Sequence, residues 1–138
     1  MGETIQVLEF ELGAERYCVD IRYVAEIVDM DDLTPVPNTP AHVEGVMDLR
    51  GRTTSIVNPR TVLGVEENGD AARARVVVFD PDELPDQGAV GWIVDAVDQV
   101  THIDPEDADD PPGEDDAVEG VVQRDDGFLV WVSPEAVN

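Results

Sequence analysis

The sequence contains no lysine, and its eight basic residues are all arginine, against 32 aspartates and glutamates. The formal net charge of the 138-residue chain is −24 at pH 7. A protein that binds nucleic acid through its phosphates needs a basic surface, and anionic membrane surfaces attract basic segments in the same way. The charge therefore excludes nucleic acid and direct membrane contact as partners.

Long apolar runs and paired cysteines are also missing. No stretch reaches the ~18 apolar residues that a membrane span needs. The first residues, Met1-Gly2-Glu3-Thr4, lack the basic start and apolar core of a signal peptide. Cys18 is the one cysteine, so the chain forms no internal disulfide. These features predict a cytoplasmic protein.

Acidic residues are spread along the whole chain rather than gathered in a tail. Dispersed acid without lysine is typical of halophilic proteins, whose surface charge keeps them in solution while salt screens the self-repulsion. We therefore expect a halophilic source, with a nucleic-acid mimic as the alternative. The net charge indicates the kind of solvent in which the protein works and does not indicate its fold.

Apolar residues make up 42% of the chain, enough for the core of one globular domain. Most lie in short β-type runs. Leu8, Phe10 and Leu12 alternate with glutamates, which predicts a half-buried strand. Between Ile21 and Val28 the spacing is ambiguous, and a short helical turn is expected to precede or interrupt a strand.

Two segments combine a hairpin with a capped helix. The first hairpin covers residues 45–57 and turns at Arg50-Gly51-Arg52, and the second covers residues 118–132. Asn58-Pro59 follows the first and Ser133-Pro134 the second, and both dipeptides are typical helix starts. A short helix is therefore expected after each hairpin.

An internal repeat emerges when the second half of the chain is aligned on the first without gaps, so that Glu119-Gly120-Val121 coincides with Glu44-Gly45-Val46. Six of the 19 positions from 44 to 62 are then identical. The repeat predicts two similar small β-barrels or curled sheets with a groove between them, because closing a sheet protects its edges.

We expect one domain over residues 5–137, with a first barrel at about 14–66 and a second at about 72–137. The N-terminal strand is a candidate for sharing between them. Residues 1–64 carry 11 acids and 5 arginines, whereas residues 65–138 carry 21 acids and 3 arginines. The first half is therefore the less repulsive surface.

Catalytic, metal and cofactor signatures are not found in the sequence. Cys18 has no acid–base partner nearby except Asp20, and a buried structural cysteine is the expected role. His42 and His102 are far apart in sequence. Residues 104–109 resemble a calcium loop in composition only, because Asp109 stands where an EF-hand needs glycine. We expect no enzyme, no metal and no cofactor.

Arg50 stands out in the first hairpin turn of a very acidic chain. One role is to pin the turn by binding a carboxylate or backbone carbonyls with its guanidinium. The other is direct contact with a partner, and the two roles are compatible.

At these residues the chain resembles the CheW-like family, and in particular its stand-alone members. The resemblance covers about residues 5–137, and the hairpin with Asp48-Leu49-Arg50-Gly51 is its most specific part. The segments that carry it are Val7–Gly13, Tyr17–Ile21, Val24–Ile27, Pro37–Pro40, Gly45–Gly51, Gly91–Val97 and Val100.

The resemblance implies an all-β fold with one or two short helices, built as two interlocked five-stranded SH3-like barrels. It implies a non-enzymatic chemotaxis adaptor that couples the cytoplasmic tips of chemoreceptors to the regulatory domain of the histidine kinase CheA in membrane-associated arrays. An acidic salt- or calcium-binding module without a signalling role is the alternative.

Receptor contact in the family lies in the groove between the barrels. Carried over by position, the contact residues are Val24, Glu26, Gly45, Arg50, Val97 and Val100. Valines suit the apolar face of a helix tip, glycine allows close approach of backbone or ligand, and the charged pair suits a polar rim.

Two local departures stand at Ser55, where the family often has proline, and at Asn58-Pro59, where it often has Asp-Leu. They change the end of a strand into a helix cap and concern local detail only. The 138 residues contain neither a receiver domain nor kinase motifs, so we expect neither a fused adaptor nor the kinase itself.

Overall fold

A computed structural model describes residues 3–13, 15–65, 75–85, 88–110, 117–124 and 127–137. These residues form strands joined by a few short helices. The elements are β1 (Ile5–Leu12), β2 (Glu15–Asp20), η1 (Ile21–Tyr23), β3 (Val24–Asp29), β4 (Val43–Leu49), β5 (Arg52–Val57), α1 (Pro59–Leu63), β6 (Arg75–Phe79), β7 (Val90–Val94), β8 (Ala96–Ile103), η3 (Pro105–Asp107), β9 (Val118–Arg124), β10 (Gly127–Val132) and α2 (Pro134–Val137).

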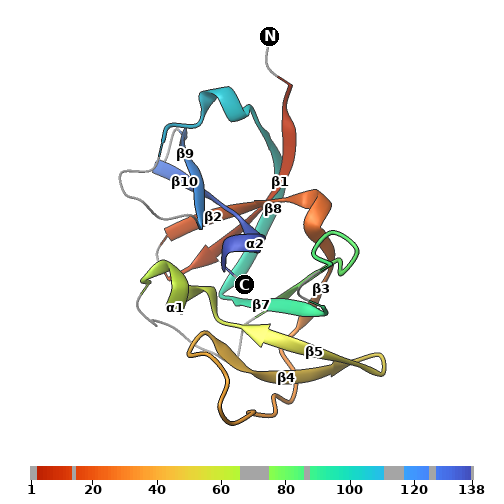
Figure 1. The fold of residues 1–138 in the computed structure, drawn as a ribbon. Coiled ribbons are helices and arrows are strands. Elements are labelled where there is room, and N and C mark those ends of the chain that lie inside the picture. The colour runs from red at the N-terminus through yellow and green to blue at the C-terminus, as the bar shows by residue number, and fades with distance from the viewer. Residues whose placement is uncertain are drawn as a thin grey trace.

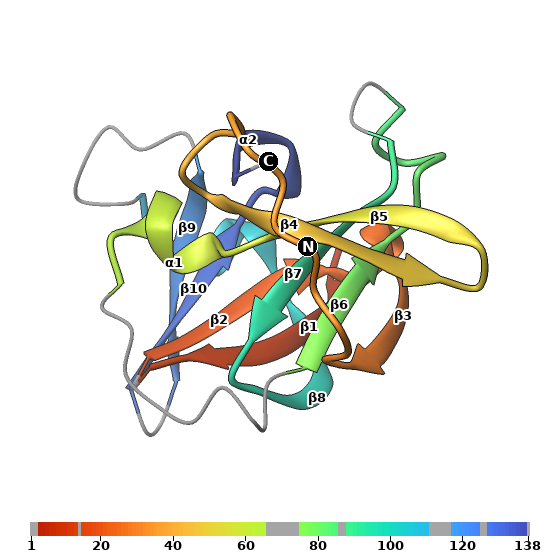
Figure 2. The same ribbon diagram turned by 90° about the horizontal axis from the view of Figure 1, so that it is seen from below.

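The strands form two five-stranded sheets, which confirms the expected all-β class. Sheet A has the order β8-β1-β2-β10-β9, and sheet B has the order β3-β6-β7-β5-β4. In Figure 1 the strands of sheet A occupy the upper half of the molecule and those of sheet B the lower half. Figure 2 looks at the molecule from the sheet B end.

The chain crosses between the sheets twice. It builds β1 and β2 of sheet A, then all five strands of sheet B, and returns to sheet A with β8, β9 and β10. In each sheet, a parallel strand pair joins an early strand to a later one. Tyr17 of β2 lies opposite Val130 of β10 in sheet A, and Ile56 of β5 lies opposite Gly91 of β7 in sheet B. Each sheet therefore contains strands from both halves of the sequence.

The expected ranges 14–66 and 72–137 are consequently not the ranges of the two sheets. Each range contributes strands to both, and the sharing goes well beyond the N-terminal strand. The physical reason is that hydrogen bonds between distant strands decide sheet membership, whereas periodicity along the sequence reports only which residues form strands.

The internal repeat is present in the backbone contacts. Thr34 and Val46 form an isolated antiparallel bridge at the edge of sheet B, with N···O distances of 2.9 Å in both directions. Asp109 and Val121, which stand at the corresponding positions of the aligned second half, form the matching bridge at the edge of sheet A, with 2.8 and 2.9 Å. The predicted duplication is thus confirmed, in an exchanged form.

The largest apolar cluster draws on both sheets. Trp92 of β7 is fully buried and meets Phe79 and Phe10 edge to face, at ring-centroid distances of 4.7 and 5.9 Å. Two smaller clusters each contain residues of one sheet only. Burial of these side chains joins the two sheets into one core.

The predicted local elements are largely found. The helical turn η1 precedes β3, and the Asn58 side chain accepts a hydrogen bond from the backbone N–H of Arg60 at the start of α1. The half-buried reading of β1 is wrong for Glu9, which is only 3% exposed. Strand β1 is covered on both faces. Cys18, which lies opposite Glu9 on β2, is fully buried as expected.

Candidate functional site

The turn of the first hairpin holds Arg50 in an unusual backbone conformation. β4 and β5 are joined by Arg50 and Gly51, whose φ angles are 56° and 83°. Two positive φ angles define the mirror-image turn that matches the twist of paired strands. For a residue with a side chain the left-handed region costs roughly 1–2 kcal/mol. The structure thus keeps an arginine where glycine or asparagine fits more easily.

Arg50 forms an ion pair with Glu26 across sheet B. The distance between Arg50 Nη2 and Glu26 Oε1 is 3.1 Å, and the side chains are 82% and 32% exposed. Glu26 lies on β3 and Arg50 follows β4, which are the two edge strands of the sheet. An exposed pair contributes only about 0–1 kcal/mol. Its effect is mainly to fix where the guanidinium lies, so of the two predicted roles the carboxylate contact is observed.

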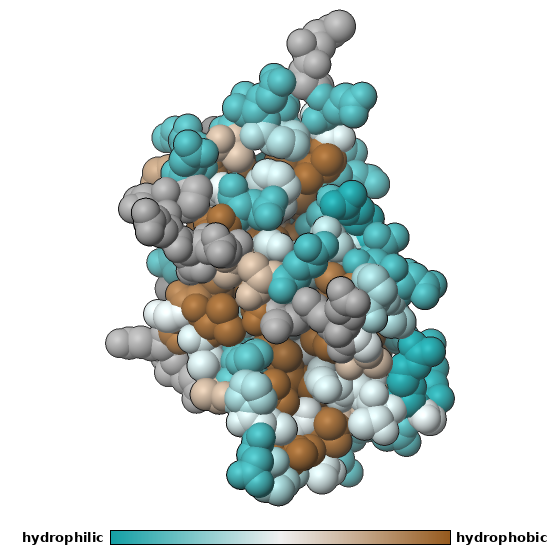
Figure 3. Space-filling view, in the orientation of Figure 1, coloured by the Kyte–Doolittle hydropathy of each residue, from teal (hydrophilic) through white to brown (hydrophobic). Residues whose placement is uncertain are grey.

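A hollow of about 270 Å³ lies beside this pair, and its lining comes from sheet B and its loops. It combines the Glu26–Arg50 pair with an apolar wall. The lining residues are Ala25, Glu26, Leu49, Arg50, Arg52, Thr54, Val78, Phe79, Pro81 and Ala89. Such a surface offers apolar contact and a charged rim together. In Figure 3 hydrophobic residues also reach the surface along the middle of the face shown, with hydrophilic residues around them.

The three predicted valines differ in their surroundings. Val24 lies opposite Phe79 and Val97 opposite Phe10, and both valines are half-buried against the cluster between the sheets. Val100 on the edge strand β8 is 48% exposed. The structure therefore gives Val24 and Val97 a packing role and leaves Val100 as the most accessible apolar member.

Gly45 is buried in β4, beneath the segment that bridges to Val46. A Cβ atom there would lie 2.3 Å from the backbone oxygen of Thr34, and the φ angle of 151° is rare for residues with side chains. Of the two predicted reasons for a glycine, the structure shows close approach of backbone. Thus Glu26 and Arg50 meet directly. Of the other predicted residues, Val24 and Gly45 lie on β3 and β4 of sheet B, and Val97 and Val100 lie on β8 of sheet A.

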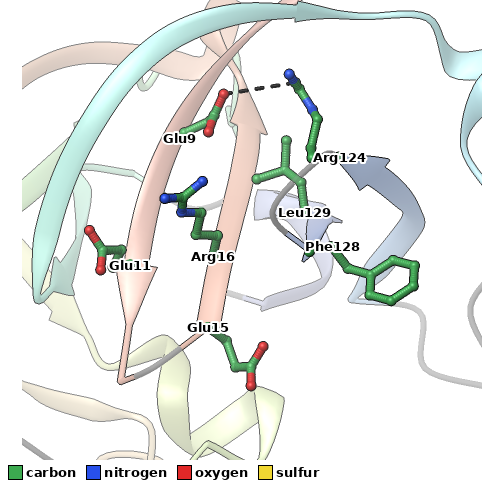
Figure 4. A pocket seen from close by; sticks show the side chains of 8 residues that line it. Glu9, Glu11, Glu15, Arg16, Arg124, Phe128 and Leu129 are labelled. Atoms are coloured by element: carbon green, nitrogen blue, oxygen red, sulfur yellow. Dashed lines mark ion pairs between the residues drawn. The ribbon is translucent and has the colours of Figure 1, made fainter.

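Sheet A has a corresponding hollow of about 310 Å³, shown in Figure 4. Here Glu9 extends into the space between β1 and β9. Its carboxylate accepts a hydrogen bond from Thr101 at 2.6 Å and lies 3.8 Å from the guanidinium of Arg124. Arg124 also donates to Thr101 at 3.2 Å, and Phe128 nearby is 59% exposed.

Sequence reasoning missed this polar cluster, although the repeat contains a signal for it. In the alignment of the two halves Arg124 coincides with Leu49, so an arginine takes the place of an apolar residue. Glu9 lies opposite Cys18, as Val78 lies opposite Gly91 in sheet B. Two complementary charges thus stand at positions that are apolar in the other sheet.

Two groups near this cluster have shifted pKa values. Burial, with a smaller effect of Glu9, raises the pKa of the Cys18 thiol to about 12, so the thiol is protonated and unreactive at neutral pH. A hydrogen bond with Asp98, followed by burial, raises the pKa of Glu11.

In the part of the chain that the structure describes, no three His, Cys, Asp or Glu side chains are grouped so that they could hold a metal ion. No helix among these residues is long and apolar enough to cross a bilayer.

Comparison with known proteins agrees with the fold. The family model of the CheW-like domain matches residues 6–138. The chain is 30% identical over 138 residues to the chemotaxis protein CheW of Treponema pallidum, covering 93% of this chain and 78% of that protein. It is 32% identical over 92 residues to the chemotaxis protein CheW of Thermotoga maritima, covering 67% and 58%.

The crystal structure of the scaffolding protein TtCheW from Thermoanaerobacter tengcongensis superposes with a TM-score of 0.84 at 26% identity. The match covers 99% of this chain and 89% of that one, and supports two SH3-like subdomains. Together these likenesses favour the adaptor over the salt- or calcium-binding module. The chain belongs to the CheW-like domain family and is a non-enzymatic chemotaxis coupling adaptor.

Proposed function

We propose that this chain acts in the cytoplasm, where it couples the tips of chemoreceptors to the regulatory domain of the histidine kinase CheA and is recruited to receptor arrays. Its receptor-binding surface consists of Val24, Glu26, Gly45, Arg50, Val97 and Val100. The observation that supports this surface best is the Arg50–Glu26 pair beside an apolar hollow, held by a turn that is costly for arginine.

The proposed surface suits a helical receptor tip. Val100 and the hollow offer apolar contact to one face of a helix, and the ion pair offers polar contacts that fix its register. Val24, Val97 and Gly45 act from behind, because they set the shape of the strands that carry the exposed residues.

We expect Arg50→Glu and Val100→Asp each to weaken binding of a purified receptor-tip fragment about tenfold or more, the scale of an interface hot spot. Arg50→Glu places two carboxylates side by side, and Val100→Asp brings a charge into the apolar contact. Isothermal calorimetry in molar KCl measures the affinity, and circular dichroism confirms the fold.

Matched controls are Arg75→Glu and Phe128→Asp. Arg75 forms an exposed ion pair with Asp29 at 3.1 Å, and Phe128 is an exposed apolar residue of sheet A. Both controls should bind the receptor fragment normally, and all four variants should still bind CheA. Normal receptor binding by Arg50→Glu and Val100→Asp would contradict the proposed surface.

We also propose a halophilic origin, supported by the net charge of −24 and the lack of lysine. The melting temperature should rise by about 10 °C between 0.01 and 1 M KCl, because the screening length falls from about 30 to 3 Å and self-repulsion is removed. Sucrose at equal osmolarity is the control, since it does not screen charge. An unchanged melting temperature in KCl, or an equal rise in sucrose, would refute this proposal.

A further inference from the structure

Asp95 is the residue at which the chain passes from sheet B back to sheet A, between β7 and β8. Its backbone N–H donates to the carbonyl oxygen of Glu11 at 2.9 Å, and its carboxylate accepts from the backbone N–H of Gly13 at 2.5 Å. The other carboxylate oxygen forms an ion pair with Arg60. One side chain thus holds the β1–β2 turn of sheet A and the helix α1, which follows β5 of sheet B.

Arg60 is itself attached firmly to sheet B. It lies in α1, whose cap residue Asn58 donates its backbone N–H to the carbonyl of His42 at 2.7 Å. The Asn58 side chain also donates to the carboxylate of Glu44 on β4 at 3.2 Å. A series of polar contacts therefore links the start of β8, the strand that carries Val97, to β4, the strand that carries Gly45.

We propose that the Arg60–Asp95 pair is a positioning clamp that sets the orientation of the two sheets, and with it the spacing between receptor-binding residues on β3, β4 and β8. The functional part rests on the receptor-binding surface proposed above. Neither residue belongs to that surface, so both act through other residues.

The cost of this pair argues for a role other than stability. The Arg60 side chain is only 9% exposed and that of Asp95 is 26% exposed, and the buried Nε of Arg60 has no hydrogen-bond partner among the described residues. Buried ion pairs often stabilise a fold less than apolar residues of the same size, because both charges lose water. The apolar cluster holds the two sheets together, but the hydrophobic effect has no preferred direction. Hydrogen bonds depend on angle and therefore select one relative orientation of the sheets.

At the first crossover, from β2 to β3, the ion pair involves an exposed arginine. Asp20 ends β2 and pairs with the exposed Arg22 of η1 at 3.4 Å, which is a contact within one short segment. Tyr23 Oη donates to Glu135 of α2 at 3.4 Å, also in an exposed position. Of the two ion pairs, the one at the second crossover, directly before β8, is thus the more deeply buried.

Spin labels on both sheets test the clamp in the full chain. Ala25 on β3 and Gln99 on β8 are exposed, and cysteines introduced there can be labelled selectively because the native Cys18 is buried. Pulsed electron spin resonance in molar KCl gives the distribution of distances between the labels. We expect Asp95→Ala and Arg60→Gln to broaden or displace it by about 2 Å, the scale of a domain rearrangement.

Conservative variants keep the test decisive if these two fold poorly. Asp95→Asn keeps an acceptor for Gly13 but loses the ion pair, so it should broaden the distance distribution less than Asp95→Ala does. Arg60→Lys keeps a positive charge beside Asp95, so its distance distribution should be nearly that of the unaltered chain. Arg75→Gln, which breaks an exposed ion pair within sheet B, is the matched control and should change nothing. Unchanged distances in folded Asp95→Asn and Arg60→Gln would overturn the clamp.

Receptor binding of the same variants, without the introduced cysteines and labels, separates the two proposals. A displaced distribution with at least a several-fold weaker affinity supports positioning, whereas a displaced distribution with normal affinity overturns the link to binding. If the unaltered chain binds no receptor fragment, the proposed function fails, and the label distances still decide whether the clamp orients the sheets.

Discussion

Replacing Gly45 with alanine is expected to lower the free energy of unfolding by about 3 kcal/mol or more, because two costs add at one position. The backbone φ of 151° is nearly restricted to glycine, and the new Cβ would lie 2.3 Å from the carbonyl oxygen of Thr34. That oxygen belongs to backbone already bridged to Val46 in both directions, so it has little room to move. Urea unfolding in molar KCl measures the change.

Two other glycines separate these costs. Gly51→Ala imposes a positive φ of 83°, and apart from its chain neighbours no atom of the described residues lies within 4 Å of the new Cβ, so it should cost only roughly 1–2 kcal/mol. Gly120, the repeat counterpart of Gly45, has 2.9 Å to the Ala108 side chain and an ordinary φ, and should lie between the two. A Gly45→Ala variant no less stable than Gly51→Ala would contradict this account. Receptor-binding losses at Gly45 therefore have to be corrected for stability.

Removing one charge or both charges of the polar cluster of sheet A should have opposite effects on the stability of the fold. Arg124→Leu alone leaves the Glu9 side chain, 4% exposed, without its cation, and should destabilise the fold by about 1–3 kcal/mol. Adding Glu9→Val recreates the Val78 and Leu49 pair of sheet B. The double variant should therefore recover all of this loss or exceed the native stability by about 1–4 kcal/mol.

A double-mutant cycle from urea unfolding measures the coupling between Glu9 and Arg124. Glu9→Val alone should cost less than Arg124→Leu alone, since the Arg124 side chain is 33% exposed and its guanidinium can reach water. The control is Arg75→Leu, an exposed pair member for which a change below about 1 kcal/mol is expected. Strictly additive losses in the double variant would show that the internal repeat is no guide to this site.

Local chemistry made the individual elements predictable. The cap at Asn58, the glycine turn after Arg50 and the apolar alternation in β1 each act over a few residues, so they can be read without knowing the fold. Even the duplication follows from sequence, because its two copies share the same cap chemistry and spacing.

Partners distant in sequence were not predictable in this way. The pairing of Tyr17 with Val130 joins residues more than a hundred positions apart, and nothing in either strand's periodicity names the other. Glu9 was misjudged for a related reason, since alternation shows which residues share a face but not whether that face meets water. Among the proposed surface residues, only the Glu26–Arg50 contact became visible once the two edges of sheet B were placed.

The exchange of strands between the sheets also determines the order in which the two sheets can be completed during synthesis on the ribosome. β1 and β2 emerge first, yet their neighbours β8 and β10 are among the last strands to be made. Sheet B, whose strands lie between residues 24 and 94, can be completed earlier. During translation the opening hairpin must therefore wait with unpaired edges, and the density of negative charge along the nascent chain offers it protection against aggregation in that interval.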